Sequence, residues 1–232
     1  MSGLPTALIT GGTSGIGLAL AHRLAGTHDL FLTGRGERTG LPKDAGFIKA
    51  DLSMPGEAAD RIEAALRQAD VGALSKLVLN AGTGTYAAVG AEDAAMIRRT
   101  LDVNLAASVL LAHRLAPFLE AGGGRLVLIG SVAYKGSGNM PAYAASKAGL
   151  AGLARSLRAE WSGRIGVQII HPGPTRTPMH EKAGYVPGRL ERLFFPADAM
   201  ADEIARLMET DRPRATVMIG ARLRRLLSGK AS

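Results

Sequence analysis

The sequence predicts one α/β domain, spanning residues 1–232, in which helices flank a doubly wound, central parallel sheet of about seven strands. Short apolar runs alternate with longer helical patterns along the whole chain. Such continuous apolar runs are typical of strands that helices bury on both faces. Their alternation with helices predicts right-handed βαβ units, and therefore parallel strands. A chain of 232 residues with 47% apolar composition, without repeats or a linker, can fold around one core.

Seven apolar runs are expected to form the strands. They cover residues 4–10, 30–33, 46–50, 77–79, 125–129, 165–170 and 215–219. The first, third and fourth precede helical patterns, and a triple glycine, Gly122-Gly123-Gly124, separates the fifth from the helix before it. Each of the first six runs ends beside a polar or turn-forming residue. Because ligands bind beyond the carboxyl ends of strands in such sheets, these ends predict the binding site.

The helices are expected at residues 15–25, 55–68, 92–119, 143–162 and 197–209, the third in one or two pieces. The first carries leucines and Ile16 among small residues, and the second begins at Pro55, whose fixed φ suits a helix start. Residues 175–196 interrupt the alternation with Pro and Gly, and are expected to form a mobile substrate lid. Residues 221–227 are expected to form a short basic amphipathic helix.

Composition excludes several classes of function. The net charge is +8, but the basic residues are dispersed and no aromatic residues alternate with them, so we expect no nucleic-acid partner. The charge instead suits anionic substrates or acidic partners. The absence of cysteine excludes disulfides and cysteine metal sites, and the five histidines lack metal-ligand spacing, so no metal is expected. No apolar run approaches the roughly 20 residues of a membrane span, and no secretory signal is evident. We expect a cytoplasmic protein.

Two motifs carry the chemistry. Tyr143 stands four residues before Lys147, so both side chains share one helix face. A phenol has an ordinary pKa of about 10, and a nearby ammonium lowers it toward the range of a general acid or base. Far upstream, a glycine-rich turn at residues 11–17 follows the first strand and suits a dinucleotide. Either motif alone is a weak signal, because helical Tyr-Lys pairs and glycine turns are both common.

Together with residues at other strand ends, these motifs resemble the short-chain dehydrogenase/reductase family along nearly the whole chain. The matching segments are the loop at residues 10–17, Asn80-Ala81-Gly82, Asn104, Ser131, Tyr143, Lys147 and Pro172-Gly173. The loop reads G-x-x-x-G-x-G, unlike the G-x-G-x-x-G of dehydrogenases with a separate substrate domain. The resemblance implies a Rossmann domain and hydride transfer between a nicotinamide and a carbonyl or alcohol.

The resemblance also implies catalytic roles. Tyr143 would donate a proton to the carbonyl oxygen, and Ser131 would hydrogen-bond the same oxygen. Lys147 would hold the ribose hydroxyls and lower the pKa of Tyr143, while Asn104 would anchor a water that relays protons to Lys147. From the residues alone, Ser131 and Asn104 are equally well explained as a strand-end cap and a helix-interior amide.

The cofactor-binding residues implied by the resemblance follow the strands in order. They are Gly11, Thr13, Ser14, Gly15, Ile16, Gly17, Arg35, Asp51, Leu52, Asn80, Ala81, Gly82, Tyr143, Lys147, Pro172, Gly173, Thr175 and Thr177. The glycines would let the backbone approach the pyrophosphate. Asp51 and Leu52 would flank the adenine, and Thr177 would bind the carboxamide. Pro174 and Thr175 depart from the more apolar segment that the family usually has before Thr177.

The second strand favours NADP(H) over NAD(H). Arg35 occupies the place in which NAD-binding proteins carry an acid that bonds the ribose 2′-hydroxyl. A guanidinium matches the geometry of a 2′-phosphate and would lack a partner beside NAD. Glu37 leaves NAD open as an alternative, although Arg38 follows it directly.

The expected enzyme is an NADP(H)-dependent oxidoreductase for a small to medium, partly apolar carbonyl or alcohol, working as a homodimer or homotetramer. Apolar side chains of the expected lid, among them Met179 and Phe194, favour such a substrate. Two alternatives stay open. One is a dinucleotide-sensing regulatory protein without turnover, which the intact Ser131, Tyr143 and Lys147 oppose. The other is a basic protein that binds nucleic acid or lipid on the same scaffold.

Overall fold

A computed structural model describes residues 3–88, 90–184, 188, 192 and 194–218. Its strands are β1 Thr6–Ile9, β2 Asp29–Gly34, β3 Gly46–Lys49, β4 Lys76–Leu79, β5 Arg125–Ile129, β6 Gly166–Pro172, β7 Thr175–Arg176, β8 Phe195–Pro196 and β9 Arg214–Val217. Its α-helices are α1 Gly15–Leu24, α2 Pro55–Gln68, α3 Ala94–Leu101, α4 Ala107–Ala121, α5 Pro141–Glu160, α6 Pro178–Lys182 and α7 Ala197–Met208. A π-helical turn, Asp102–Ala106, joins α3 to α4, and a 3₁₀ turn, Val132–Lys135, follows β5.

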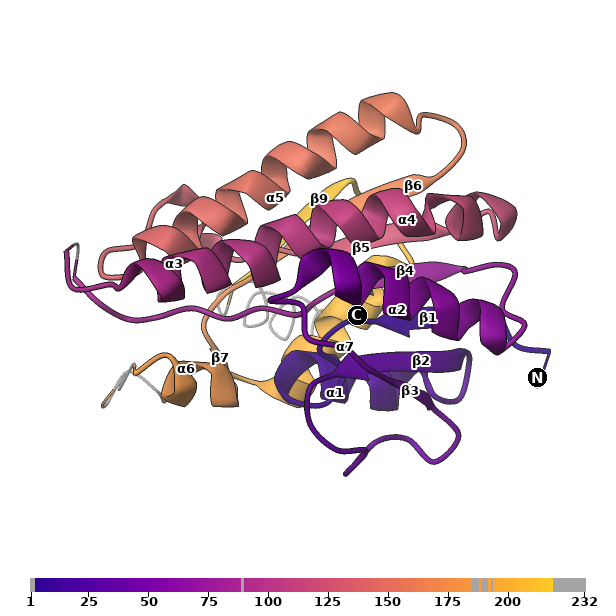
Figure 1. Cartoon of the computed structure of the whole chain (residues 1–232), viewed down its shortest axis with the longest axis horizontal. Coiled ribbons are helices and arrows are strands. Elements are labelled where there is room, and N and C mark those ends of the chain that lie inside the picture. Colours follow the sequence, from indigo (N-terminus) through magenta and orange to yellow (C-terminus); the bar gives the residue numbers. More distant parts are fainter. Residues whose placement is uncertain (1–2, 89, 185–187, 189–191, 193, 219–232) are drawn as a thin grey trace, which may run out of the picture.

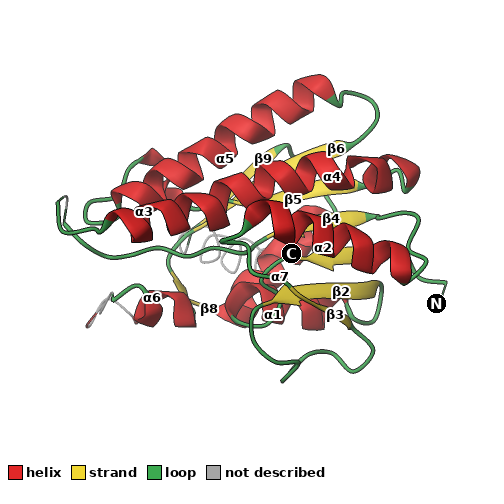
Figure 2. Ribbon diagram, viewed as in Figure 1, coloured by secondary structure: helices red, strands yellow, loops and turns green. Residues whose placement is uncertain are grey.

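The main sheet has seven strands in the order β3-β2-β1-β4-β5-β6-β9 (Figure 2). Every pair of neighbouring strands is parallel, as the strand-helix alternation predicts. The predicted fold class, a single doubly wound Rossmann domain, is therefore confirmed. Strand order reverses between β1 and β4, because the chain first builds toward β3 and then returns to build toward β9. This reversal opens a crevice at the carboxyl ends of the strands.

Two layers of helices bury the sheet (Figure 1). On one face α2, α4 and α5 form a core with residues such as Leu77 and Leu126, and on the other face α1 and α7 pack on residues such as Ile9 and Val127. Consecutive strand residues thus face different cores, which explains why the strands are apolar throughout. Because helices cover both faces, the polar residues that follow the strands meet at the carboxyl edge of the sheet.

The two layers leave the short α6 and β7 outside the main sheet, at the carboxyl edge (Figure 1). β7 pairs with β8 in a separate two-stranded sheet, which the sequence did not predict. The expected lid at residues 175–196 therefore has regular structure at both ends. Positions 185–187, 189–191 and 193 within it, and the helix expected at 221–227, lie outside the described residues. Among the residues placed by the structure, no helix is long and apolar enough to cross a membrane.

Candidate active site

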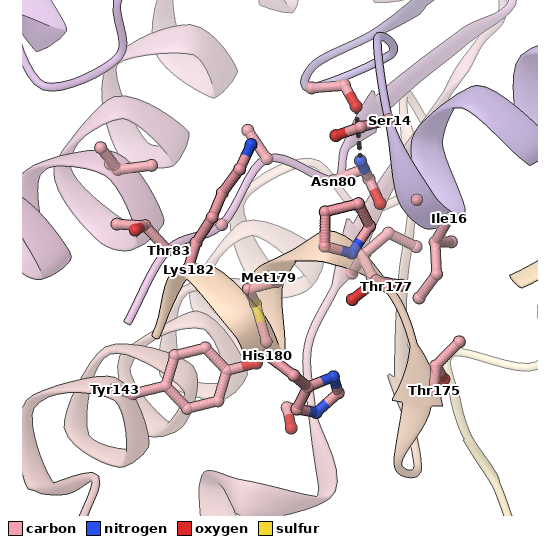
Figure 3. A pocket seen from close by; sticks show the side chains of 18 of the residues that line it. Ser14, Ile16, Asn80, Thr83, Tyr143, Thr175, Thr177, Met179, His180 and Lys182 are labelled. Atoms are coloured by element: carbon pink, nitrogen blue, oxygen red, sulfur yellow. Dashed lines mark hydrogen bonds between the residues drawn. The ribbon is translucent and has the colours of Figure 1, made fainter. Parts of the chain in front are cut away.

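A cavity of about 740 Å³ opens above the carboxyl ends of the strands. The loops after β1, β2, β3, β4, β5 and β6 line it, together with α6 and the start of α5. Figure 3 looks into this cavity, with Tyr143 on one side and Thr177, Ile16 and Ser14 on the other. All of the site residues predicted from the sequence line the cavity except Gly17 and Asn104. Both of these pack directly behind the cavity wall.

The glycine-rich turn is a tight fold of backbone. Gly11 and Gly15 have φ angles of +63° and +54°, which side chains other than hydrogen rarely allow. Gly17 has ordinary helical geometry, but a Cβ there would lie 2.3 Å from the carbonyl oxygen of Gly11 and 2.4 Å from Asn80 Nδ2. The turn therefore closes against the first residues of α1, and it leaves the helix N-terminus directed into the cavity.

Thr10 and Asn80 clamp this turn to the neighbouring strand end. The Thr10 hydroxyl accepts hydrogen bonds from the backbone N–H groups of Asn80 and Ala81, at 3.0 and 3.1 Å. In return the Asn80 amide donates to the carbonyl oxygens of Thr10 and Gly11, at 3.0 and 3.3 Å. Thr10 was part of the recognised motif, but no separate role was predicted for it. Its position directly after β1, as the last residue before the turn, is the sequence feature from which a bond to the end of β4 could have been predicted.

The Ser131 side chain contacts both the backbone of the 3₁₀ turn and the Tyr143 phenol. Its hydroxyl accepts a hydrogen bond from Ala133 N at 3.2 Å and so caps the 3₁₀ turn after β5. The Ser131 side chain also lies near enough to the phenol of Tyr143 to lower the pKa of that phenol. The capping role that the residue alone suggests and the proximity that the family resemblance implies are therefore both present.

Tyr143 and Lys147 lie on the same face of α5, and both are buried at the cavity wall. The Lys147 ammonium donates to the carbonyl oxygen of Ile129 at 2.9 Å and lies 5.6 Å from the centroid of the Tyr143 ring. Burial lowers the pKa of Lys147 to about 8. The i, i+4 spacing thus brings the two groups together as predicted.

The prediction that the pKa of Tyr143 is lowered is wrong. Burial raises the pKa of the phenol above its ordinary value, and the nearby Ser131 side chain only partly opposes that rise. The Lys147 ammonium donates to the carbonyl oxygen of Ile129 and lies over the Tyr143 ring, and burial is the largest influence on the phenol pKa. The phenol is consequently protonated at neutral pH, a state that suits a proton donor.

Asn104 lies in the π-helical turn and is fully buried. Its side chain forms a pair of hydrogen bonds with the backbone of Thr83, each 2.8 Å long, and donates to Ser146 Oγ at 3.0 Å. π-helical turns recur at functional sites, where the extra residue redirects a side chain. Here the redirected amide fixes the segment after β4 to α5, beside Lys147. Thr83 and Ser146 were not predicted, although Ser146 directly precedes Lys147.

The far end of the cavity is charged. Arg35 and Glu37 line it after β2, and Asp51 and Leu52 line it after β3. Burial disfavours the ionised Asp51 carboxylate, but two hydrogen bonds from Ser53 and the charges of Arg35 and Arg99 outweigh it and lower the pKa. Arg99, on α3, also lines the cavity and was not predicted.

The described part of the expected lid borders the cavity with both polar and apolar groups. Thr175 donates its hydroxyl to the carbonyl of Gly173 at 2.9 Å, so the side chain stabilises its own turn. Thr177 lies against Gly15, where an added Cβ would approach the Thr177 methyl to 3.1 Å. On α6, Met179, His180 and Lys182 face the cavity, and the His180 ring lies 5.2 Å from that of Phe194.

Comparison with known proteins agrees with this geometry. The model of the short chain dehydrogenase family matches residues 5–185. The chain belongs to the short-chain dehydrogenase/reductase family. It is 35% identical, over 74% of its length and 70% of the relative, to the 3-oxoacyl-(acyl-carrier-protein) reductase MabA of Mycobacterium tuberculosis. The family assignment predicted from the sequence is confirmed, and this short-chain dehydrogenase/reductase is an oxidoreductase.

Solved structures of the family are also similar. A short-chain dehydrogenase from Sphingobium yanoikuyae in complex with NADPH has a TM-score of 0.80 and 30% identity, covering 98% of this chain and 93% of that one. A short-chain dehydrogenase from Burkholderia cenocepacia in complex with NADP has a TM-score of 0.80 and 29% identity, covering 94% and 98% respectively. The likeness therefore extends over nearly the whole fold.

Proposed function

We propose that this short-chain dehydrogenase/reductase uses NADP(H) to reduce a small to medium, partly apolar carbonyl compound to an alcohol. The observation that carries the proposal is the convergence of Ser131, Tyr143 and Lys147 on one cavity whose far end holds Arg35. The nicotinamide of a bound cofactor would supply the hydride. The residues of the chain would bind and orient the reactants and deliver the proton.

Tyr143 delivers the proton in this proposal. Its raised pKa keeps the phenol protonated until negative charge develops on the carbonyl oxygen. The Ser131 hydroxyl, which lies near the phenol, offers a second hydrogen bond to that oxygen. Lys147 favours the phenolate that remains after the proton has left, because an adjacent cation stabilises an anion in a low-dielectric site. Asn104 holds Thr83 beside Lys147, and its predicted water relay stays a prediction.

The cavity fits a dinucleotide phosphate at the end that Arg35 lines. Gly11 and Gly15 present bare backbone at the start of α1, as a pyrophosphate requires. Arg35, at the end of β2, offers a guanidinium for a 2′-phosphate. The NADPH and NADP complexes of the Sphingobium and Burkholderia proteins support the same preference. Glu37 lines the same end and represents the NAD alternative.

Apolar groups support the proposed substrate class. Met140, Met179 and Phe194 line the cavity on the side of Tyr143 and α6. MabA, one of the similar proteins, is a reductase of 3-oxoacyl groups, which also carry a ketone on an apolar chain. A ketone or aldehyde with an apolar substituent therefore suits the described walls of this cavity.

We also propose a homodimer or homotetramer. Val109 and Leu110 are exposed on α4, at 42% and 37%, and Met96 is exposed on α3. Exposed apolar side chains on these two consecutive helices favour a contact with a second protein surface. Light scattering coupled to size-exclusion chromatography should give a mass of two or four chains, and Val109→Glu should lower it. A monomer at micromolar concentration would contradict the proposal.

A reductase assay tests the function. Aldehydes, ketones and alcohols should be screened by nicotinamide absorbance with NADP(H) and NAD(H), and at least one carbonyl should be reduced. Tyr143→Phe keeps the ring but removes the donor, and should lower kcat by about 100-fold or more. Binding of NADPH, measured by fluorescence, should persist in the variant. Near-normal turnover by Tyr143→Phe would remove Tyr143 as the proton donor, and the absence of any turnover by the unmutated protein would favour a sensing function.

A further inference from the structure

His171 is the one buried histidine of β6, and the proposed chemistry does not use it. The side chain has no solvent-exposed surface and lies outside the cavity wall. It directly precedes Pro172 and Gly173, which do line the cavity. A fully buried imidazole beside a reaction site needs a structural or a functional reason, because burying a polar ring costs free energy unless hydrogen bonds compensate it.

The imidazole holds the backbone of Ser131. Its Nδ1 atom lies 3.2 Å from the carbonyl oxygen of Ser131, and because a carbonyl only accepts, Nδ1 must carry the proton and donate. The same oxygen also accepts from Tyr134 N at 3.1 Å, within the 3₁₀ turn. The bond from Tyr134 is local to that turn. The bond from His171 is the one that ties Ser131 to the neighbouring strand.

The second ring nitrogen fixes the protonation state. His171 Nε2 is buried and has no hydrogen-bond partner within the described part of the chain. Burial, together with the charges of Arg214, Lys147 and Lys135, lowers the pKa of His171 to about 4, despite the bond to Ser131. A proton on Nε2 would have no acceptor, so the ring is neutral at physiological pH with its single N–H directed at Ser131.

The surroundings hold this ring in place. Gly130 supplies the space for it, since a Cβ at that position would lie 2.5 Å from His171 Nδ1. The ring of Tyr134 covers the imidazole with its centroid 4.2 Å away. The guanidinium of Arg214, from β9, lies over the Tyr134 ring and hydrogen-bonds its hydroxyl. The orientation of the imidazole is therefore set by the segment that follows β5 and by the first residue of β9.

We propose that His171 is a positioning residue, which holds the Ser131 peptide so that the serine hydroxyl meets both the Tyr143 phenol and the substrate oxygen. This inference rests on the proposed function, because it concerns the rate of proton delivery at that site. A hydroxyl that must serve two partners tolerates little displacement, and small displacements of reacting groups slow catalysis strongly. Backbone pairing holds the chain to β6 as far as Gly130, whose N–H donates to the carbonyl oxygen of Ile170 at 2.7 Å. Without His171, the carbonyl of Ser131 would keep, among the described residues, only the local bond from Tyr134.

Two substitutions separate positioning from packing. His171→Leu keeps a similar volume but removes the donor. His171→Asn loses volume but carries an amide N–H near the place of Nδ1. Positioning predicts that His171→Leu lowers kcat for carbonyl reduction about tenfold or more, with KM for NADPH close to its unmutated value. It also predicts that His171→Asn retains most of the activity, although the smaller side chain leaves a void under Tyr134.

A double-mutant comparison adds a readout that packing alone would not change. In a Ser131→Ala background, His171→Leu should cause little further loss of kcat, because the hydroxyl it positions is already absent. If His171→Leu does not fold, His171→Gln, whose amide lies one carbon too far out, should show the same tenfold loss of kcat on its own and little further loss in the Ser131→Ala background.

Three outcomes would overturn this inference alone. Equal losses in His171→Asn and His171→Leu would make the ring a packing element. A raised KM for NADPH with unchanged kcat would instead assign His171 to the Pro172-Gly173 turn. Additive losses in the Ser131→Ala background would separate His171 from the serine. In each case the proposed function survives if Ser131→Ala is itself slow, whereas full activity of Ser131→Ala would remove the serine from the mechanism and His171 with it.

Discussion

Lys147→Met should make the cofactor-free protein more stable while it abolishes reduction. The Lys147 side chain is 3% exposed, and burial lowers its pKa from 10.5 to about 8. At about 1.4 kcal/mol for each pH unit, this difference corresponds to roughly 3 kcal/mol by which the charged group destabilises the fold at pH 7. Methionine removes that cost but also the hydrogen bond to Ile129, worth about 1 kcal/mol. The net expected gain is about 2 kcal/mol.

The pH dependence distinguishes this cause from any other. A lysine whose pKa is lower in the folded protein destabilises it fully below pH 8, where both states are protonated. Between pH 8 and 10.5 the unfolded chain holds the proton and the folded protein does not, so the stability of the unmutated protein rises with pH. At pH 10 only about 1 kcal/mol of the cost remains, and Lys147→Met and the unmutated protein should be equally stable.

Urea unfolding at pH 7 and pH 10, followed by circular dichroism, measures both differences. Lys49→Met, at an exposed position on β3, is the matched control for the change of side chain. The reasoning would be refuted if Lys147→Met were less stable than the unmutated protein at pH 7. It would equally fail if the stability difference between the two proteins were the same at both pH values.

Two further substitutions probe the cofactor end of the cavity. Gly17→Ala should destabilise the fold by about 1–3 kcal/mol and weaken NADPH binding, since the added methyl meets the carbonyl of Gly11. Gly152→Ala lies within α5, where an added Cβ would come no closer than 4.0 Å to the Arg155 guanidinium, and it should be neutral or stabilising in the same urea unfolding assay. Arg35→Asp should shift the ratio of kcat/KM from NADPH toward NADH, while Glu37→Gln should leave it unchanged. Equal kcat/KM for both cofactors in the unmutated protein would contradict the role of Arg35.

The sequence predicted the bounds of those helices and strands that begin or end at a neighbouring proline or glycine. The bounds Pro55–Gln68 and Arg125–Ile129 were predicted without error. Proline sets the start of the first and a triple glycine precedes the second. The π-helical turn at Asp102–Ala106 and the pairing of β7 with β8 were not predicted. Both depend on contacts between distant segments, such as the bond from Phe195 N to the carbonyl of Pro174.

In the site, too, the sequence predicted what depends on local spacing and missed what depends on contacts between distant segments. Spacing alone placed Tyr143 and Lys147 on one helix face, because four residues make about one turn. Spacing could not give the pKa of the phenol, since that depends on burial and on where the ammonium is directed. Nor could it find His171, whose only sequence signal is its place before Pro172. A residue that acts through the backbone of another is recognisable only once both strands are in position.

Burial moves Tyr143 and Lys147 toward their neutral forms, one by raising a pKa and the other by lowering it. At pH 7 the phenol is therefore protonated and the ammonium is still charged, so the cation gains no phenolate partner until the proton leaves. The attraction between Lys147 and Tyr143 thus develops only as negative charge forms. An interaction that is stronger in the transition state than in the ground state raises kcat. The burial that makes Lys147 costly for the fold is then the same property that makes it effective in proton delivery.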